Sequence, residues 1–116
     1  MLHTIPGNTD RQRQSRKYAE GRLGEDTSFY FRGPDQKLNL RAQNLKLFIQ
    51  IAAGVDDESW LHHLHRQDYS RWVKEALKDD SLANEIGQIE TDCRDSVNQS
   101  RTQIFSAIER RYTAPV

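Results

Sequence analysis

Three histidines in the segment WLHHLHR, His62, His63 and His65, are the residues whose type and spacing could most directly support chemistry. On a helix, His62 and His65 lie one turn apart, and Glu58 lies one turn before His62 on the same face, so two or three metal ligands could converge there. A closed zinc site needs four ligands, and the HExxH pattern of zinc hydrolases is absent. The sequence therefore favours histidines on the polar face of an amphipathic helix, and no bound metal is expected.

Carboxylates and the cysteine offer little more. The acidic runs 56–58 and 79–80 stand where helix N-termini favour negative charge, which accounts for them without acid–base chemistry. Cys93 is the only cysteine, so no internal disulfide forms, and a nucleophilic role would need a histidine and a further partner. The chain has no GxxxxGK[ST], GxGxxG, GxSxG, CxxC or DxDxT segment. Neither a catalytic centre nor a cofactor is expected.

Composition limits the class of protein and partner. A chain of 116 residues fits one small domain. Lysine plus arginine and aspartate plus glutamate both number 17, so no overall field attracts nucleic acid or anionic lipid. The longest apolar stretch, Leu45 to Ala53, is interrupted by Gln50 and is shorter than the ~20 residues of a membrane span, and the start MLHTIPGNTD lacks a secretory apolar region. We expect a soluble cytoplasmic protein.

The first quarter of the chain differs from the rest. Residues 1–26 contain several glycines, a proline and the polar run DRQRQSRK, without a sustained apolar period. This pattern predicts a flexible tail or linker over 1–26, followed by a helical domain over 27–116. Within that domain, Phe29 and Phe31 alternate in the segment Thr27 to Arg32, before the turn Gly33-Pro34-Asp35. This pattern predicts a short strand, either alone or as one arm of a hairpin that returns through Lys37 and Leu38.

Helical periodicity dominates the remaining sequence. One helix is expected over Leu40 to Ala53, with Asn39 as its cap. Further helices are expected to begin at the capping residues Asp56, Asp68 and Ser96 and at the acidic pair Asp79-Asp80. The helix that begins at Asp68 has the clearest apolar stripe, formed by Tyr69, Trp72, Val73, Ala76 and Leu77. The last is expected to reach about Tyr112, although a single helix from Leu82 to Tyr112 is a competing interpretation. The predicted fold is mainly α, a compact bundle of four to five helices with a short strand or hairpin before the first.

Polar residues that flank the apolar stripes form the best candidate interaction surface, because they include donors suited to an anionic group. An ordinary solvated face is the alternative. The candidate residues are Arg41, Asn44, His62, His63, Arg66, Arg71 and Lys74.

From Leu38 to Glu90 the sequence contains the words LNLRAQNL, GVDD, WLHHL and DYSRW and the lysine–aspartate pair Lys78-Asp79, preceded by FYFRGP. In these words it resembles an accessory helical segment of bacterial haloacid dehalogenase-like hydrolases, which are often labelled phosphoglycolate phosphatases. In that group the chemistry belongs to an aspartate-x-aspartate segment in a separate α/β domain, and this chain has no such segment. The resemblance implies a free-standing version of an appended module and transfers no catalytic residue.

These observations leave three functional hypotheses. The first is a non-enzymatic interaction or regulatory module for a protein partner or a small anionic ligand, without nucleic-acid or membrane binding. The second is an accessory subunit or domain that supports a haloacid dehalogenase-like phosphatase, and a copurifying protein with the aspartate-x-aspartate segment would favour it. The third, a metal-dependent enzyme centred on His62 and His65, requires metal in the purified protein.

Overall fold

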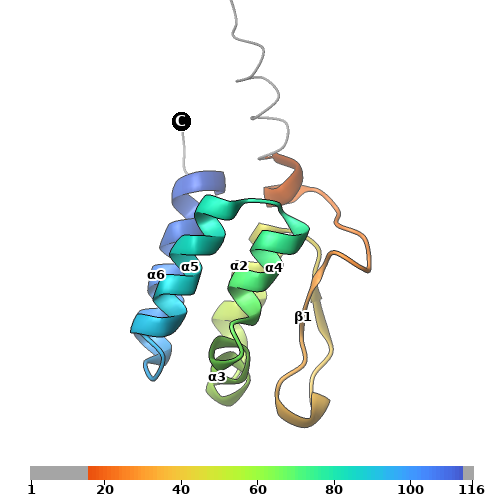
Figure 1. Ribbon diagram of the computed structural model, residues 1–116. Helices are drawn as coiled ribbons and strands as arrows, with labels where there is room; N and C mark the ends of the chain where they lie inside the picture. The colour runs from red at the N-terminus through yellow and green to blue at the C-terminus, as the bar shows by residue number, and fades with distance from the viewer. Residues whose placement is uncertain (1–15, 114–116) are drawn as a thin grey trace, which may run out of the picture.

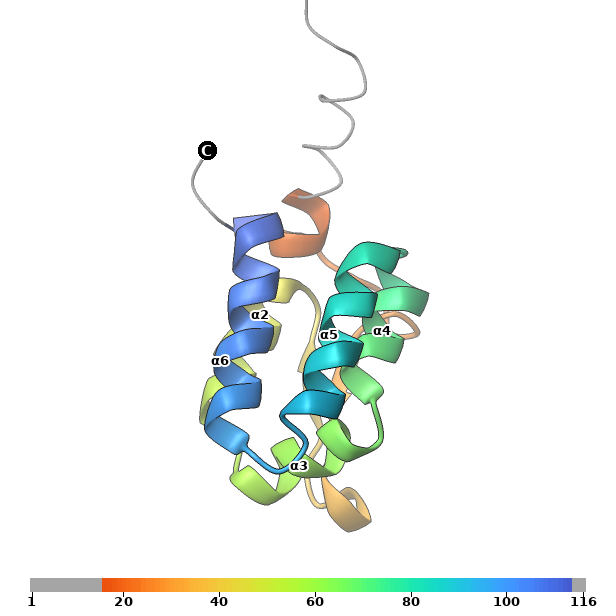
Figure 2. The same ribbon diagram turned by 60° about the vertical axis from the view of Figure 1, so that its left-hand side comes forward.

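The computed structural model of the protein describes residues 16–113, and its fold is mainly α with a short antiparallel hairpin before the main helices, as the sequence predicted. In chain order the elements are a helical turn at 16–20, β1 (Phe29–Phe31), a 3₁₀ turn (Pro34–Gln36), β2 (Leu40–Ala42), α2 (Leu45–Gly54), α3 (Asp57–His65), α4 (Asp68–Ala76), α5 (Asp80–Asp92), α6 (Val97–Ile108) and a π-type turn (Glu109–Thr113). Helices α2, α4, α5 and α6 run side by side, α3 lies across one end, and the hairpin flanks α2 and α4 (Figures 1 and 2).

Three helices begin where the sequence predicted, and each has a side-chain cap. The side chains of Asp56, Asp79 and Ser96 accept the backbone N–H three residues later, at 3.1, 2.9 and 3.1 Å. The expected cap at Asp68 is wrong, because Asp68 is the first residue of α4 and Gln67 occupies the cap position. Gln67 has a left-handed backbone (φ 60°, ψ 32°), and its side chain makes no capping hydrogen bond. A carboxylate from another helix, that of Glu90 in α5, instead accepts the N–H of Ser70 at 3.2 Å.

The expected helix from Leu40 begins later in the structure. Residues Leu40–Ala42 form β2, which pairs with β1 so that Phe29 faces Ala42 and Phe31 faces Leu40. Helix α2 then begins at Leu45 with Asn44, not Asn39, as its cap, since the Asn44 side chain accepts the N–H of Leu47 at 2.8 Å. The returning strand also comes later than the expected Lys37 and Leu38. The position of β2 is set by its pairing with β1, because a lone strand leaves its backbone groups unpaired.

The competing interpretation of one helix from Leu82 to Tyr112 does not hold. Helix α5 ends at Asp92, where Cys93 leaves the helical region (φ −113°, ψ 31°), and α6 begins at Val97. The short connection allows α6 to return beside α5 (Figure 2). Two apolar stripes then face one core, which a single helix could not achieve.

Part of the segment expected to be a tail packs on the domain. Ala19 and Leu23 are 2% and 5% exposed. The backbone here is also held, because Arg41 donates to the Leu23 carbonyl at 2.9 Å and Asn44 donates to the Gly21 carbonyl at 2.8 Å. The predicted tail over 1–26 thus includes residues that pack against the helical domain, whereas residues 1–15 lie outside the described part of the chain.

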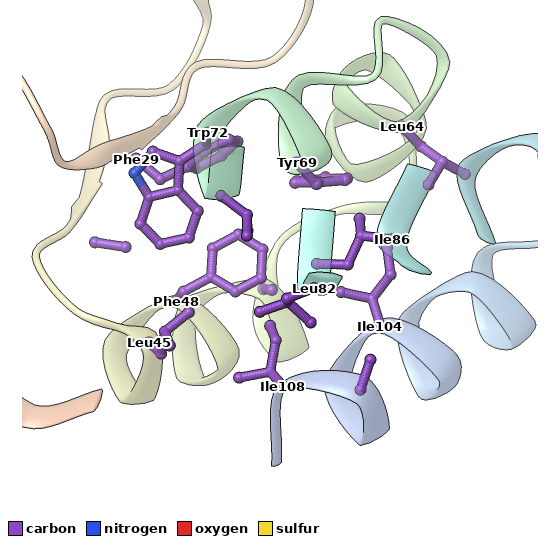
Figure 3. Packing of buried hydrophobic residues seen from close by; sticks show 14 of the residues in the cluster. Phe29, Leu45, Phe48, Leu64, Tyr69, Trp72, Leu82, Ile86, Ile104 and Ile108 are labelled. Atoms are coloured by element: carbon purple, nitrogen blue, oxygen red, sulfur yellow. The ribbon is translucent and has the colours of Figure 1, made fainter. Parts of the chain in front are cut away.

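The core is rich in aromatic rings (Figure 3). Phe48 of α2 stacks on Trp72 of α4 with ring centroids 5.3 Å apart, and Phe29 of β1 meets both rings edge-on at 5.4 Å. Aliphatic side chains of α5 and α6 fill the other half, as Figure 3 shows for Leu82, Ile86, Ile104 and Ile108. Within residues 16–113, no helix combines the length and apolar character needed to cross a membrane.

Candidate functional site

A hollow of about 430 Å³ lies between the loop of the hairpin and the corner where α3 meets α4. We call it the hairpin pocket. Its volume is within the range of small-ligand sites in proteins. It is lined by Phe29, Tyr30, Arg32, Gly33, Asp35, Gln36, His62, His63, Arg66 and Asp68.

His63 joins the two walls of the pocket. Its side chain is 7% exposed, and its Nε2 accepts the backbone N–H groups of Arg32 and Gly33 at 3.1 and 3.2 Å. Because Nε2 is an acceptor, the ring proton is on Nδ1, which donates to the Asp68 carboxylate at 2.8 Å. A buried imidazole with three hydrogen bonds is fully satisfied, and it couples the hairpin loop to the beginning of α4.

Asp68 is the centre of a small ionic cluster. One of its oxygens accepts the hydrogen bond from His63 Nδ1 and also lies 3.4 Å from Arg66 Nε. The other oxygen lies 3.2 Å from a terminal nitrogen of Arg71. Burial acts to raise the pKa of Asp68, but the His63 hydrogen bond and the two guanidinium groups outweigh it and hold that pKa below its ordinary value. Asp68 is therefore ionised at neutral pH, with its charge matched by its neighbours.

Several residues at this pocket have positive φ angles, which are rare for residues other than glycine. Gly33, Asp35 and Gln36 of the hairpin loop have φ of 71°, 55° and 54°, and Gln67 at the facing corner has φ of 60°. Only one further residue of the described chain, Lys78, has a positive φ. At Gly33 a Cβ would also lie 2.5 Å from the Ser59 hydroxyl oxygen, so glycine is required there. Conformations of this kind cost on the order of 1 kcal/mol each, and they are often found at functional sites.

Two guanidinium groups line the pocket. That of Arg32 lies 4.7 Å from the ring centroid of Tyr30, whose hydroxyl donates to the Glu25 carbonyl at 2.9 Å. A single weak hydrogen bond of 3.4 Å links Arg32 to Asn39. The Arg66 guanidinium uses Nε toward Asp68 and is 62% exposed. Since a guanidinium carries five N–H donors, each group keeps donors that have no acceptor among residues 16–113.

His62 is the remaining basic residue of the lining. Its pKa lies below the ordinary value, chiefly because of burial and then because of the neighbouring His63 and Arg66. Its imidazole is therefore mainly neutral at pH 7. The pocket thus combines two permanent positive charges with Asp35 and a charge-matched Asp68.

The structure brings together only part of the surface proposed from the sequence. His62, His63 and Arg66 line the pocket, and Arg71 reaches it through Asp68, while Lys74 is exposed on α4 outside the lining. Arg41 and Asn44 are committed elsewhere, because both hold the segment that contains Gly21 and Leu23.

The residues considered as metal ligands have separate partners. His65 Nε2 lies 2.8 Å from the Arg94 carbonyl oxygen, and Glu58 forms an ion pair with Lys37 at 2.8 Å. In the described range 16–113, no three side chains of the types His, Cys, Asp or Glu come close enough together to hold a metal ion.

Sequence reasoning missed three members of the site. Arg32 was assigned to the short strand, Asp35 to the turn that follows it and Asp68 to helix capping. The spacing of five between His63 and Asp68 is not that of a helix face, and it becomes a contact only because Gln67 reverses the backbone. The strand–glycine–proline–aspartate run FYFRGPD was a usable signal, since a glycine-containing loop often approaches another element closely.

No family model, curated protein or solved structure matches the chain. The resemblance to the accessory segment of haloacid dehalogenase-like hydrolases therefore stays a prediction from sequence. Chemically, the pocket can offer guanidinium donors to an anionic group. Its lining contains no serine, threonine or cysteine, and the hydroxyl of Tyr30 is already used on Glu25.

Proposed function

We propose that this chain is a non-enzymatic interaction or regulatory module whose binding surface is the hairpin pocket. One observation supports this most directly: the polar groups of the pocket divide into two sets. In the first set, the polar atoms of His63 and Asp68 are already hydrogen-bonded or ion-paired to each other, to backbone amides and to guanidinium groups. Arg32 and Arg66 keep donors that have no acceptor in the described part of the chain.

The first set gives the second a rigid support. His63 fixes the hairpin loop to the α3–α4 corner, so Arg32 and Arg66 face one hollow from different elements. A preformed site loses less conformational freedom when it binds, which favours recognition by a few groups. The left-handed residues on both walls of the pocket are compatible with this role, since such conformations are often found at functional sites.

The alternative function is support for a haloacid dehalogenase-like phosphatase, either as its subunit or as a detached domain. The resemblance over Leu38 to Glu90 suggests it, and a pocket with guanidinium donors is compatible with an anionic substrate. In this case the chain would bind the phosphatase or select its substrate, while catalysis would belong to the partner.

The test is quantitative affinity capture with the full chain as bait in its native cell. The pocket variant carries Arg32→Ala and Arg66→Ala, and the matched control carries Lys74→Ala and Lys78→Ala, which remove the same charge from outside the pocket. We expect at least one protein that the parent and the control retain equally and that the pocket variant loses at least fivefold. Identical retention by all three baits would contradict a role for the pocket.

Phosphate release by the purified chain tests the non-enzymatic part of the proposal. We expect background rates on phosphoglycolate, with or without magnesium, since binding without selective stabilisation of the transition state does not accelerate a reaction. Turnover that disappears in a His62→Ala, His65→Ala double variant would overturn it. A captured protein with the aspartate-x-aspartate segment whose turnover changes when this chain is added would select the phosphatase-supporting alternative.

A further inference from the structure

The charge balance of the hairpin pocket limits the ligand that it can take. Arg32 and Arg66 contribute two positive charges and Asp35 one negative charge, all at the pocket lining. The negative charge of Asp68 is matched by Arg71, which lies 3.2 Å away and outside the lining. His62 adds little, because burial and its basic neighbours keep its imidazole mostly neutral at pH 7. The excess is close to one positive charge, which suits a monoanion.

The geometry of the donors indicates the same kind of ligand. A guanidinium is planar and its parallel N–H groups match the two oxygens of a carboxylate. Arg32 is held in place by the ring of Tyr30 and by Asn39, and Arg66 is held by Asp68 through Nε, so both groups are partly oriented before a ligand arrives. Phe29 and Tyr30 add apolar ring surface to the wall, against which the methylene groups of a side chain could pack.

We propose that the hairpin pocket binds a glutamate or aspartate side chain from an acidic segment of a protein partner, with its carboxylate between Arg32 and Arg66. This inference rests on the proposed interaction function and names the chemistry of the partner. Asp35 opposes the ligand charge, so it limits affinity and rejects groups that carry a second negative charge. Specificity for a monoanion then comes from a repulsive group as well as from attractive ones.

Fluorescence anisotropy with two labelled peptides tests the proposal. One peptide alternates glycine and glutamate over twelve residues, and the other has glutamine in place of glutamate. We expect the parent chain to bind the glutamate peptide at least tenfold more tightly. Arg32→Ala and Arg66→Gln should each weaken that binding at least fivefold, while Lys74→Ala, on α4 outside the pocket lining, should change it less than twofold.

The variant Asp35→Asn provides a test of opposite sign. Asparagine adopts the left-handed conformation of residue 35 at least as readily as aspartate, so the loop is retained while the repulsion is removed. We expect binding of the glutamate peptide to tighten two- to fivefold. A purely structural contribution of the loop would not produce this gain. Circular dichroism of every variant verifies that the helices are intact.

Three results would overturn the inference. In the first, Lys74→Ala weakens binding as much as Arg66→Gln, which would indicate general charge attraction. In the second, inorganic phosphate competes at concentrations tenfold below those of acetate, which would assign the pocket to a phosphoryl group. In the third, the glutamate peptide does not bind while affinity capture still depends on Arg32 and Arg66. That outcome would reject the acidic ligand but retain the proposed interaction function.

Discussion

Helix α4 connects two regions that are built on different physical principles. Its apolar face, with Tyr69, Trp72 and Val73, packs into the aromatic core. Its N-terminus lies at the hairpin pocket, where contacts are directional hydrogen bonds to His63 and Asp68. Burial of apolar area is non-directional, so the core supplies stability without requiring one exact backbone, whereas the pocket depends on a few atoms at defined distances.

Two buried titratable groups extend this comparison. His63 has partners at both ring nitrogens, but Glu90 is 2% exposed and one of its carboxylate oxygens has no hydrogen-bond partner. Burial raises the pKa of Glu90, although its bonds with Ser70 and Tyr69 act to lower that pKa. The polar group at the pocket is thus satisfied, whereas the one inside the helical half carries a residual penalty.

The largest effect is expected from Trp72→Ala, which removes the ring that joins Phe29, Phe48 and the Thr27 carbonyl. Truncation of a buried aromatic residue costs about 3–5 kcal/mol, which approaches the full stability of a small domain. We expect thermal denaturation to show a domain that is unfolded or severely loosened. In the control Trp72→Phe, most of the apolar contact remains and the hydrogen bond to the Thr27 carbonyl is lost, so the expected destabilisation is smaller, about 1 kcal/mol. An unchanged melting temperature in the alanine variant would show that the core is not centred on this ring.

A second prediction tests whether the segment at 16–26 belongs to the core. Leu23 is 5% exposed, so Leu23→Ala should destabilise the domain by about 2 kcal/mol. For a domain of this size that corresponds to roughly 8–16 °C in melting temperature. Substitution of the exposed neighbour Arg22 by alanine is the control and should have little effect. Equal melting temperatures of the two variants would restore the interpretation of this segment as a linker.

The third prediction concerns the hydrogen bonds of the pocket. His63→Ala leaves the amides of Arg32 and Gly33 and the carboxylate of Asp68 without their partner, and an unsatisfied buried group costs about 1–3 kcal/mol. We expect a moderate loss of global stability but a selective rise in hydrogen exchange at Arg32 and Gly33. His65→Ala, on the exposed side of the same helix, is the control. Exchange that rises uniformly in α5 and α6 would show that His63 supports the core, not the loop.

The smallest effect is expected from Glu90→Gln, and the test is how the stability difference between this variant and the parent changes with pH. Because the pKa of Glu90 is raised in the folded state, the folded chain keeps this proton at a pH where the unfolded chain has already lost it. The free energy of unfolding therefore falls as pH rises from about 4.5 through the folded-state pKa. Glutamine does not titrate. The variant should therefore gain stability relative to the parent between pH 4 and pH 8, by a margin read from urea denaturation at each pH. A difference that is independent of pH would mean that the folded domain does not perturb Glu90.

The sequence by itself determined the features that depend on a few neighbouring residues. Asp56, Asp79 and Ser96 cap helices because each side chain reaches an amide only three positions ahead. The stripe from Tyr69 to Leu77 predicted a buried face because a helix repeats every 3.6 residues whatever surrounds it. These local signals were sufficient for the fold class and for most of the helix starts.

Only the tertiary structure decided the elements that need a distant partner. Leu40–Ala42 has an apolar content that suits either a helix or a strand, and its pairing with Phe29–Phe31 selected the strand. Leu23 is buried because Arg41 and Gln43 hold its backbone, and His63 meets Asp68 because Gln67 turns back between two helices. Such contacts form when the free energy of burial and hydrogen bonding across the fold exceeds local preference, and no short window of sequence contains both partners.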